Sequence, residues 1–146
     1  MMLEMPSGKT FIGKLAHGCD LLAEITRICH EQCWTAGWLE GLGAVKKARV
    51  GFYDQATREY RHLDLDFPLE ITHLVGNISL KEGVPFVHVH ITFADNQGRA
   101  FGGHLAPGTI VFAGEIMIRP FASTALQRNL DAETGLFLWQ EVASLA

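Results

Sequence analysis

Hydrophobic and polar residues alternate along much of the chain, which is the period-2 pattern of β-strands that bury one face. The clearest case lies between Val87 and Phe93, where four apolar residues alternate with His88, His90 and a threonine. This pattern places both histidines on the face opposite the apolar one. Related patterns predict strands over residues 10–15, 45–53, 59–65, 69–75, 77–80 and 110–118, with Gly76 as a bend or bulge and Pro120 as a stop.

One segment has helical spacing instead. Asp20 is suited to cap a helix, and apolar residues follow it at the intervals of one helix face. We expect this helix to end near Trp34. Cys29 and Cys33 would share a face with Ile25, which predicts small core residues rather than metal ligands.

The residues after the histidine-bearing strand predict a tight hairpin. Asp and Asn open turns, and Gly98 can adopt the left-handed conformation that closes a three-residue loop over residues 96–98. In that register His90 lies directly opposite His104, with Cβ atoms about 5 Å apart. A slip of one residue would send His104 to the apolar face.

His88 is the diagonal neighbour on the same face, so three imidazoles converge. Three histidines without an evident fourth ligand are typical of a divalent metal site, zinc in particular, with one position open for water or a small ligand. The alternative is that His88 and His90 are surface residues of a half-exposed strand and that His104 caps the next strand.

Two carboxylates stand inside otherwise apolar strands, Glu70 and Glu115. Burying a carboxylate is costly unless it is paired or bound. Either residue is therefore a candidate to orient a histidine or to act as general base beside a metal-bound water. Exposure to solvent is the alternative for both.

Composition narrows the class of protein. The 146 residues are 48% hydrophobic and 19% charged, which predicts a single globular domain over residues 1–146. A net charge of −4 argues against direct binding of nucleic acid. Three cysteines, no signal peptide and no apolar run of membrane-spanning length predict a cytoplasmic protein without a membrane partner.

Near the end of the chain, Arg128 and its neighbours predict a polar turn before an apolar patch over residues 136–139, which a short strand or an interface would bury.

Several short motifs occur in an order that resembles the plant and prokaryote conserved (PPC) domain family, in its stand-alone bacterial or archaeal form. They are Gly41-Leu42-Gly43-Ala44-Val45, Leu69-Glu70-Ile71, Gly76-Asn77-Ile78, His88-Val89-His90, Gly102-Gly103-His104-Leu105 and Gly114-Glu115-Ile116. The resemblance implies an α+β fold, with one main helix packed on a strongly bent antiparallel sheet, assembled as a homotrimer. It also implies a metal, zinc, on the histidines at positions 88, 90 and 104.

Two functions follow from these observations. In the first, a trimeric domain uses its metal to hold or activate a small ligand, and the sequence does not decide whether this activity is enzymatic. In the second, the domain is a non-enzymatic assembly or regulatory module. Plant members carry AT-hooks, which are short basic segments that enter the DNA minor groove, and this sequence has none. Association with DNA would therefore depend on a partner protein.

Overall fold

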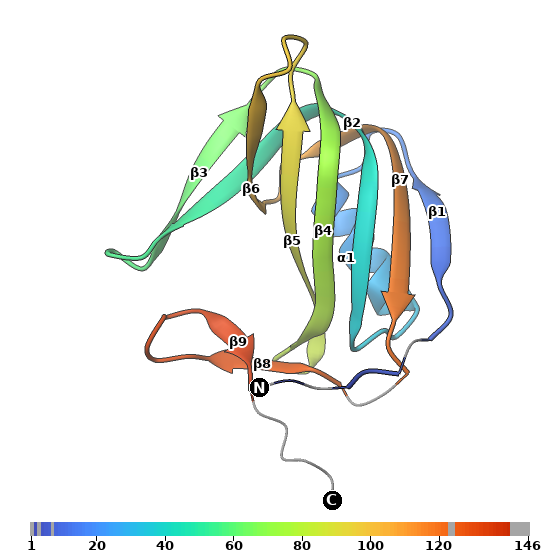
Figure 1. Cartoon of the computed structure of the whole chain (residues 1–146), viewed down its shortest axis with the longest axis vertical. Helices are drawn as coiled ribbons and strands as arrows, with labels where there is room; N and C mark the ends of the chain where they lie inside the picture. The colour runs from blue at the N-terminus through green and yellow to red at the C-terminus, as the bar shows by residue number, and fades with distance from the viewer. Residues whose placement is uncertain (1, 3, 7, 123–124, 141–146) are drawn as a thin grey trace, which may run out of the picture.

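The computed structural model describes residues 2, 4–6, 8–122 and 125–140, which form a nine-stranded sheet and one helix (Figure 1). In chain order the elements are β1 (Phe11–Leu15), α1 (Leu21–Glu31), β2 (Gly37–Asp54), β3 (Glu59–Leu65), β4 (Leu69–Lys81), β5 (Val84–Ala94), β6 (Ala100–Leu105), β7 (Ile110–Pro120), β8 (Gln127–Leu130) and β9 (Phe137–Trp139). Among these residues no helix is long and apolar enough to cross a membrane.

The sheet bends because β2 pairs with two sets of neighbouring strands. The first half of β2 pairs with β4 and β7, whereas its second half pairs with β3 and, at Val50 and Gly51, with β6. Since β4 pairs with β5 and β5 with β6, these pairings form a closed ring. All pairings between named strands are antiparallel except the short contact of β4 with β8. The predicted α+β fold with a strongly bent antiparallel sheet is therefore confirmed.

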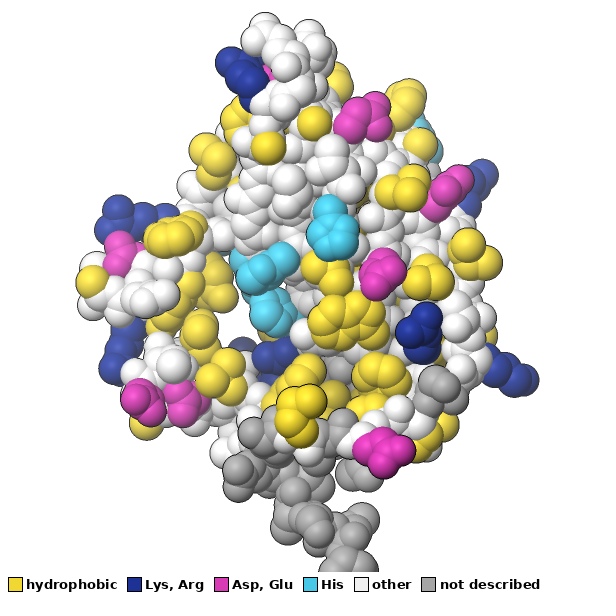
Figure 2. Space-filling model, in the orientation of Figure 1, with side chains coloured by type: hydrophobic (Ala, Val, Ile, Leu, Met, Phe, Trp, Pro, Cys, Tyr) yellow, Lys and Arg dark blue, Asp and Glu magenta, His cyan; other side chains and the backbone are white. Residues whose placement is uncertain are grey.

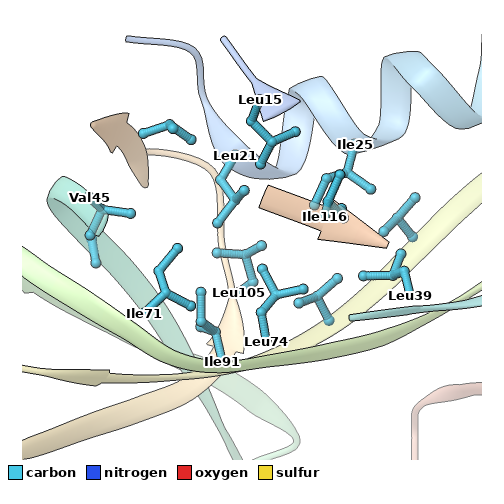
Figure 3. Close-up of a cluster of buried hydrophobic side chains, with 14 of the residues drawn as sticks. Leu15, Leu21, Ile25, Leu39, Val45, Ile71, Leu74, Ile91, Leu105 and Ile116 are labelled. Atoms are coloured by element: carbon cyan, nitrogen blue, oxygen red, sulfur yellow. The ribbon is translucent and has the colours of Figure 1, made fainter. Parts of the chain in front are cut away.

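Helix α1 packs on one face of this sheet and closes the core (Figures 1 and 3). Asp20 caps it as predicted, since its Oδ1 accepts a hydrogen bond from the backbone N–H of Ala23 at 3.0 Å. Its Oδ2 accepts from Gly108, at 2.6 Å, and so ties the helix to the β6–β7 loop. Leu21 and Ile25 are fully buried, and each contributes about 1.5–3 kcal/mol to the stability of the fold by leaving water.

The predicted end of the helix, the predicted start of the next strand and the predicted burial of Cys33 need correction. The helix ends at Glu31, and Cys33 is exposed in a left-handed conformation rather than part of the core. Strand β2 begins at Gly37 rather than at residue 45, and Gly41 and Gly43 flank a bulge inside the strand. At Gly43 a side chain would collide with the backbone oxygen of Ala113, so a glycine here lets β2 and β7 lie side by side.

Strand β4 is continuous through Gly76. A side chain at Gly76 would collide with the backbone oxygen of His88, so this glycine permits close pairing with β5 rather than a bend. The irregularity lies instead between Ile71 and His73. It shifts the alternation by one residue, so that Leu74 is buried and His73 is exposed.

The predicted β5–β6 hairpin is confirmed. The backbone N–H of Asp95 donates to Arg99 at 3.1 Å, and the N–H of Gly98 donates to Asp95 at 3.0 Å. Gly98 has a φ of 75°, as the three-residue loop requires. The register then pairs His90 with His104.

The end of the described chain forms a second small hairpin, β8–β9. The predicted short final strand is present as β9, which pairs antiparallel with β8. The sequence suggested that Arg128 lies in a turn, but it does not. It lies in β8, and only 6% of its surface is exposed.

Candidate metal centre

Three histidines on β5 and β6 lie together on the face of the sheet that is turned away from the core. Strand alternation buries Val87, Val89 and Ile91 and leaves His88 and His90 on the other face. The ring centroids of His88, His90 and His104 are 4.9–5.7 Å apart. Figure 2 shows histidine side chains gathered at the edge of a hollow.

The histidines are suited to donate lone pairs. Burial, reinforced by the positive charge of neighbouring histidines and Arg128, lowers the pKa of His88 to about 4. The pKa of His104 is lowered to about 4 for the same reasons, burial again being the largest. Both rings are therefore neutral at pH 7, which is the form that coordinates a metal.

The donor atoms lie near one another, at separations wider than those of a formed zinc site. One ligand atom from each histidine can be chosen so that all three lie within 4.8 Å of one another. Two nitrogens bound to one tetrahedral zinc at about 2.1 Å are about 3.4 Å apart, so the rings must approach one another by up to about 1.4 Å to share an ion. In the described structure Nδ1 of His104 is buried without a hydrogen-bond partner, and an ion bound there would satisfy it.

Tyr60 supports the cluster from β3, and sequence reasoning did not identify it. Its ring lies 5.1 Å from the ring of His104 at an angle of 46°. Gly51, which pairs with His104, leaves room for this contact, since a Cβ there would lie 3.0 Å from the Tyr60 ring. The pKa of Tyr60 is raised, mainly by burial, so its phenol is a neutral hydroxyl at pH 7.

The histidines open into a cavity of about 660 Å³ between two hairpins. The β2–β3 hairpin forms one wall and the β8–β9 hairpin forms another (Figure 1). The two hairpins meet where the hydroxyl of Tyr53 donates to the backbone oxygen of Thr134 at 2.8 Å. Nη2 of Arg58 donates to the backbone oxygen of Glu133 at 3.0 Å. A cavity of this size accommodates a small metabolite.

Arg128 lies in the wall of this cavity, held by three neutral acceptors. Its Nε donates to Oγ of Ser79 at 2.7 Å, Nη1 to the backbone oxygen of Phe137 at 2.8 Å, and Nη2 to Oδ1 of Asn77 at 2.7 Å. Asn77 pairs with His88 across β4 and β5, which brings the guanidinium close to the cluster. No local sequence signal marks this position, because Arg128 lies forty positions after His88 in the chain.

The structure does not bring Glu70 or Glu115 to the histidines. Glu70 is exposed and lies five residues before Val75, the partner of His90, which is roughly 15 Å along β4. Glu115 is exposed on β7, which β2 and β4 separate from β5 by about 14 Å. Neither residue lines the cavity. Both carboxylates are exposed to solvent, which is the alternative that the sequence left open.

A larger hollow of about 810 Å³ lies along α1, but the arginine that lines it is already paired with carboxylates. Its only arginine, Arg27, donates to Glu24 and Glu31 on the same helix. Within the described residues, the three histidines are the group that could hold a metal ion.

Known sequences share this architecture. A sequence model described as the Plants and Prokaryotes Conserved (PCC) domain matches residues 2–122. The chain is also 33% identical over 135 residues to the bifunctional protein GlmU of Synechococcus sp. strain JA-3-3Ab. A second Synechococcus GlmU is 34% identical over 135 residues. Each match covers 90% of this chain, which spans about a fifth of the length of these curated relatives.

Solved structures agree over nearly the whole chain. A protein from Archaeoglobus fulgidus described as metal-containing is 39% identical and superposes with a TM-score of 0.91, over 97% of this chain and 99% of its own. A plant- and prokaryote-conserved protein from Pyrococcus horikoshii is 30% identical, also with a TM-score of 0.91, over 98% of this chain and 99% of its own. These matches include the β8–β9 hairpin, which lies beyond the residues that the family model covers.

Proposed function

The chain belongs to the Plants and Prokaryotes Conserved domain family, and from this membership and its histidine cluster we propose that it is a metal-binding domain protein. His88, His90 and His104 hold one divalent ion, zinc, and leave a position open for water or a small ligand. The observation that carries the proposal is the convergence of the three imidazoles, with donor atoms within 4.8 Å, at the edge of a cavity. The description of the Archaeoglobus relative as metal-containing supports it.

The surroundings of the cluster suit a small ligand. A zinc ion with an open position lowers the pKa of a bound water to about 7 or polarises a carbonyl group. Among the chain's own residues, Tyr60 packs against His104 and keeps its ring in place. The two hairpins that meet at Tyr53 and Arg58 form two walls of the cavity.

Elemental mass spectrometry on untagged protein tests this proposal. We expect about one zinc per chain in the wild type and loss of the metal in His90→Ala and His104→Ala. His73→Ala is the matched control, because His73 is an exposed histidine of β4 outside the cluster. Wild-type protein without metal after incubation with zinc would contradict the proposal, as would full metal content in the cluster variants.

A second function, assembly into a homotrimer that serves as a binding module, has support of its own. Ile12, Leu42 and Phe112 expose 84%, 57% and 56% of their surfaces on β1, β2 and β7. Apolar side chains on neighbouring strands of one sheet commonly become buried between subunits. This surface lies on strands other than those that carry the histidines, so assembly and metal binding do not exclude each other.

Light scattering coupled to size-exclusion chromatography tests the assembly. We expect the wild type at three times the chain mass and Leu42→Glu at a lower mass. Thr72→Glu, an exposed position of β4, provides a control for the added charge. A wild type that elutes at the mass of one chain would contradict the trimer.

A further inference from the structure

The cavity beside the histidines has an unbalanced charge. Its lining includes Arg58, Lys81 and Arg128, and none of the described residues in the lining is an aspartate or glutamate. The chain as a whole has a net charge of −4, so the cavity opposes the average sign of the protein. Neutral histidines do not compensate these cations, and a divalent ion on the histidines would add two further positive charges.

Arg128 contributes most to this excess of positive charge, because it is buried and has no anionic partner among the described residues. Four other arginines, at positions 27, 49, 61 and 99, form ion pairs with carboxylates. Arg128 is 94% buried, and its described partners are Ser79, Asn77 and a backbone oxygen, all neutral. A buried cation is costly unless an anion or several hydrogen bonds compensate it.

Arg128 has donors left over for an anion. A guanidinium has five N–H groups, and Arg128 uses one on Nε, one on Nη1 and one on Nη2 with its described partners. One N–H remains on each terminal nitrogen. Paired N–H groups of this kind bind the two oxygens of a carboxylate, in the bidentate geometry that arginine favours.

The other two cations have lesser roles. Nζ of Lys81 lies 3.7 Å from the centre of the Phe137 ring, so this charge is partly compensated by the aromatic face. Arg58 donates hydrogen bonds to backbone oxygens of the β8–β9 turn. The pKa of Asp131 in this turn is lowered mainly by hydrogen bonds from Thr134 and to a smaller extent by the charge of Arg58. Arg128 is therefore the residue we assign to the ligand.

Most of the remaining wall of the cavity is apolar. Phe86 and Phe137 line it beside Tyr60, and Leu136 and Leu138 complete the side formed by the last hairpin. Arg128 itself lies over the ring of Phe86, with Cζ 5.5 Å from the ring centre. A ligand that matches this lining has an apolar body and a single anionic end.

We propose that the ligand of this site is a small organic acid whose carboxylate binds Arg128 and whose apolar body packs against Tyr60, Phe86 and Phe137. The proposal rests on the proposed metal site for the second anchor, where a carbonyl or hydroxyl oxygen of the same ligand meets the open position of the ion. Arg128 is a binding residue in this scheme and no bond is broken.

Calorimetric titration of the zinc-loaded protein with phenylacetate, which has the carboxylate and the apolar body but no second oxygen for the metal, tests the Arg128 end of the proposal, with phenylacetamide as the uncharged probe of the same shape. We expect phenylacetate to bind and phenylacetamide to bind at least about tenfold more weakly, because a hydrogen-bonded charge is lost. Arg128→Met should weaken phenylacetate by about tenfold or more. Arg119→Met, which removes an exposed arginine of β7, should bind as the wild type does.

Metal content measured on the same samples separates the two proposals. If zinc is present at one per chain and phenylacetate does not bind, or binds no better than phenylacetamide, the organic-acid proposal is overturned and the metal site stands. If zinc is absent but phenylacetate still binds in a manner that depends on Arg128, the metal site fails and the anion site stands. The comparison of the two probes on the wild type needs no variant, so a poorly folded Arg128→Met protein does not prevent a decision.

Discussion

The ring of Tyr60 packs against the ring of His104, with centroids 5.1 Å apart, although the two residues lie on different hairpins. The contact is possible because β6 pairs with β2 at Gly51, directly beside β3. A metal-binding histidine whose ring is held in place by packing loses less freedom when the ion binds.

Removal of the Tyr60 ring should therefore weaken metal binding. We expect Tyr60→Ala to lower zinc affinity by about tenfold or more, the range seen when residues that support a metal ligand are removed. Tyr60→Phe keeps the ring and should retain the wild-type affinity, since packing rather than the hydroxyl supports His104. Competition with a chromogenic chelator measures both values. Equal affinity in the wild type and Tyr60→Ala would show that the contact does not position the ligand.

The metal-free protein should lose stability in mild acid. Burial, the neighbouring histidines and Arg128 together lower the pKa values of His88 and His104 from 6.5 to about 4, so between these pH values the unfolded chain binds more protons than the folded one. The contribution of these two residues is fully present above pH 6.5 and is lost as the pH falls towards 4. Urea unfolding in the presence of a chelator, at pH 7 and pH 5, measures the change.

A double variant, with His88→Asn and His104→Asn, is the control for this pH dependence. Its midpoint should change less between pH 7 and pH 5 than that of the wild type, because asparagine does not titrate. An identical change in both proteins would assign the acid sensitivity to other groups.

Gly98 should be the critical residue of the β5–β6 hairpin. Its φ of 75° is unfavourable for other residues, so Gly98→Val should cost about 1–2 kcal/mol and lower the melting temperature by several degrees. Gly13→Val is the matched control, because Gly13 lies exposed in β1 and a Cβ there meets no other atom within 4 Å. Differential scanning calorimetry compares the two, and an equal loss in both would contradict a specific role of the loop.

The cysteines of the helix region should differ in reactivity. Cys29 is fully buried, and burial raises the pKa of its thiol to about 12, whereas Cys33 is exposed. We expect an aromatic disulfide reagent to modify Cys33 rapidly in the native protein and Cys29 only after unfolding. Loss of the rapid phase in Cys33→Ser would confirm the assignment. A rapid phase that persists in this variant would point to Cys19 or to an opening of the helix.

Local patterns were sufficient to predict the histidine pair. Alternation places His88 and His90 on one face, and the turn residues at 95–98 allow one register, so the pairing of His90 with His104 follows from residues within twenty positions of one another. The helix cap at Asp20 was predictable for the same reason, because a cap is a contact with residues two or three positions away.

The long-range closure of the sheet decided the rest of the site. Tyr60 and Arg128 reach the histidines because β2 bends across two sets of neighbours and β8 returns beside the end of β4, and no local pattern indicates either contact. The same closure leaves Glu70 and Glu115 in solvent, although their sequence neighbourhoods are apolar. The alternation of apolar residues and the type of a turn depend on short stretches of chain, so both can be predicted from the sequence. Which strands become neighbours depends on how the whole apolar surface is buried, and this determined the walls and the charge of the cavity.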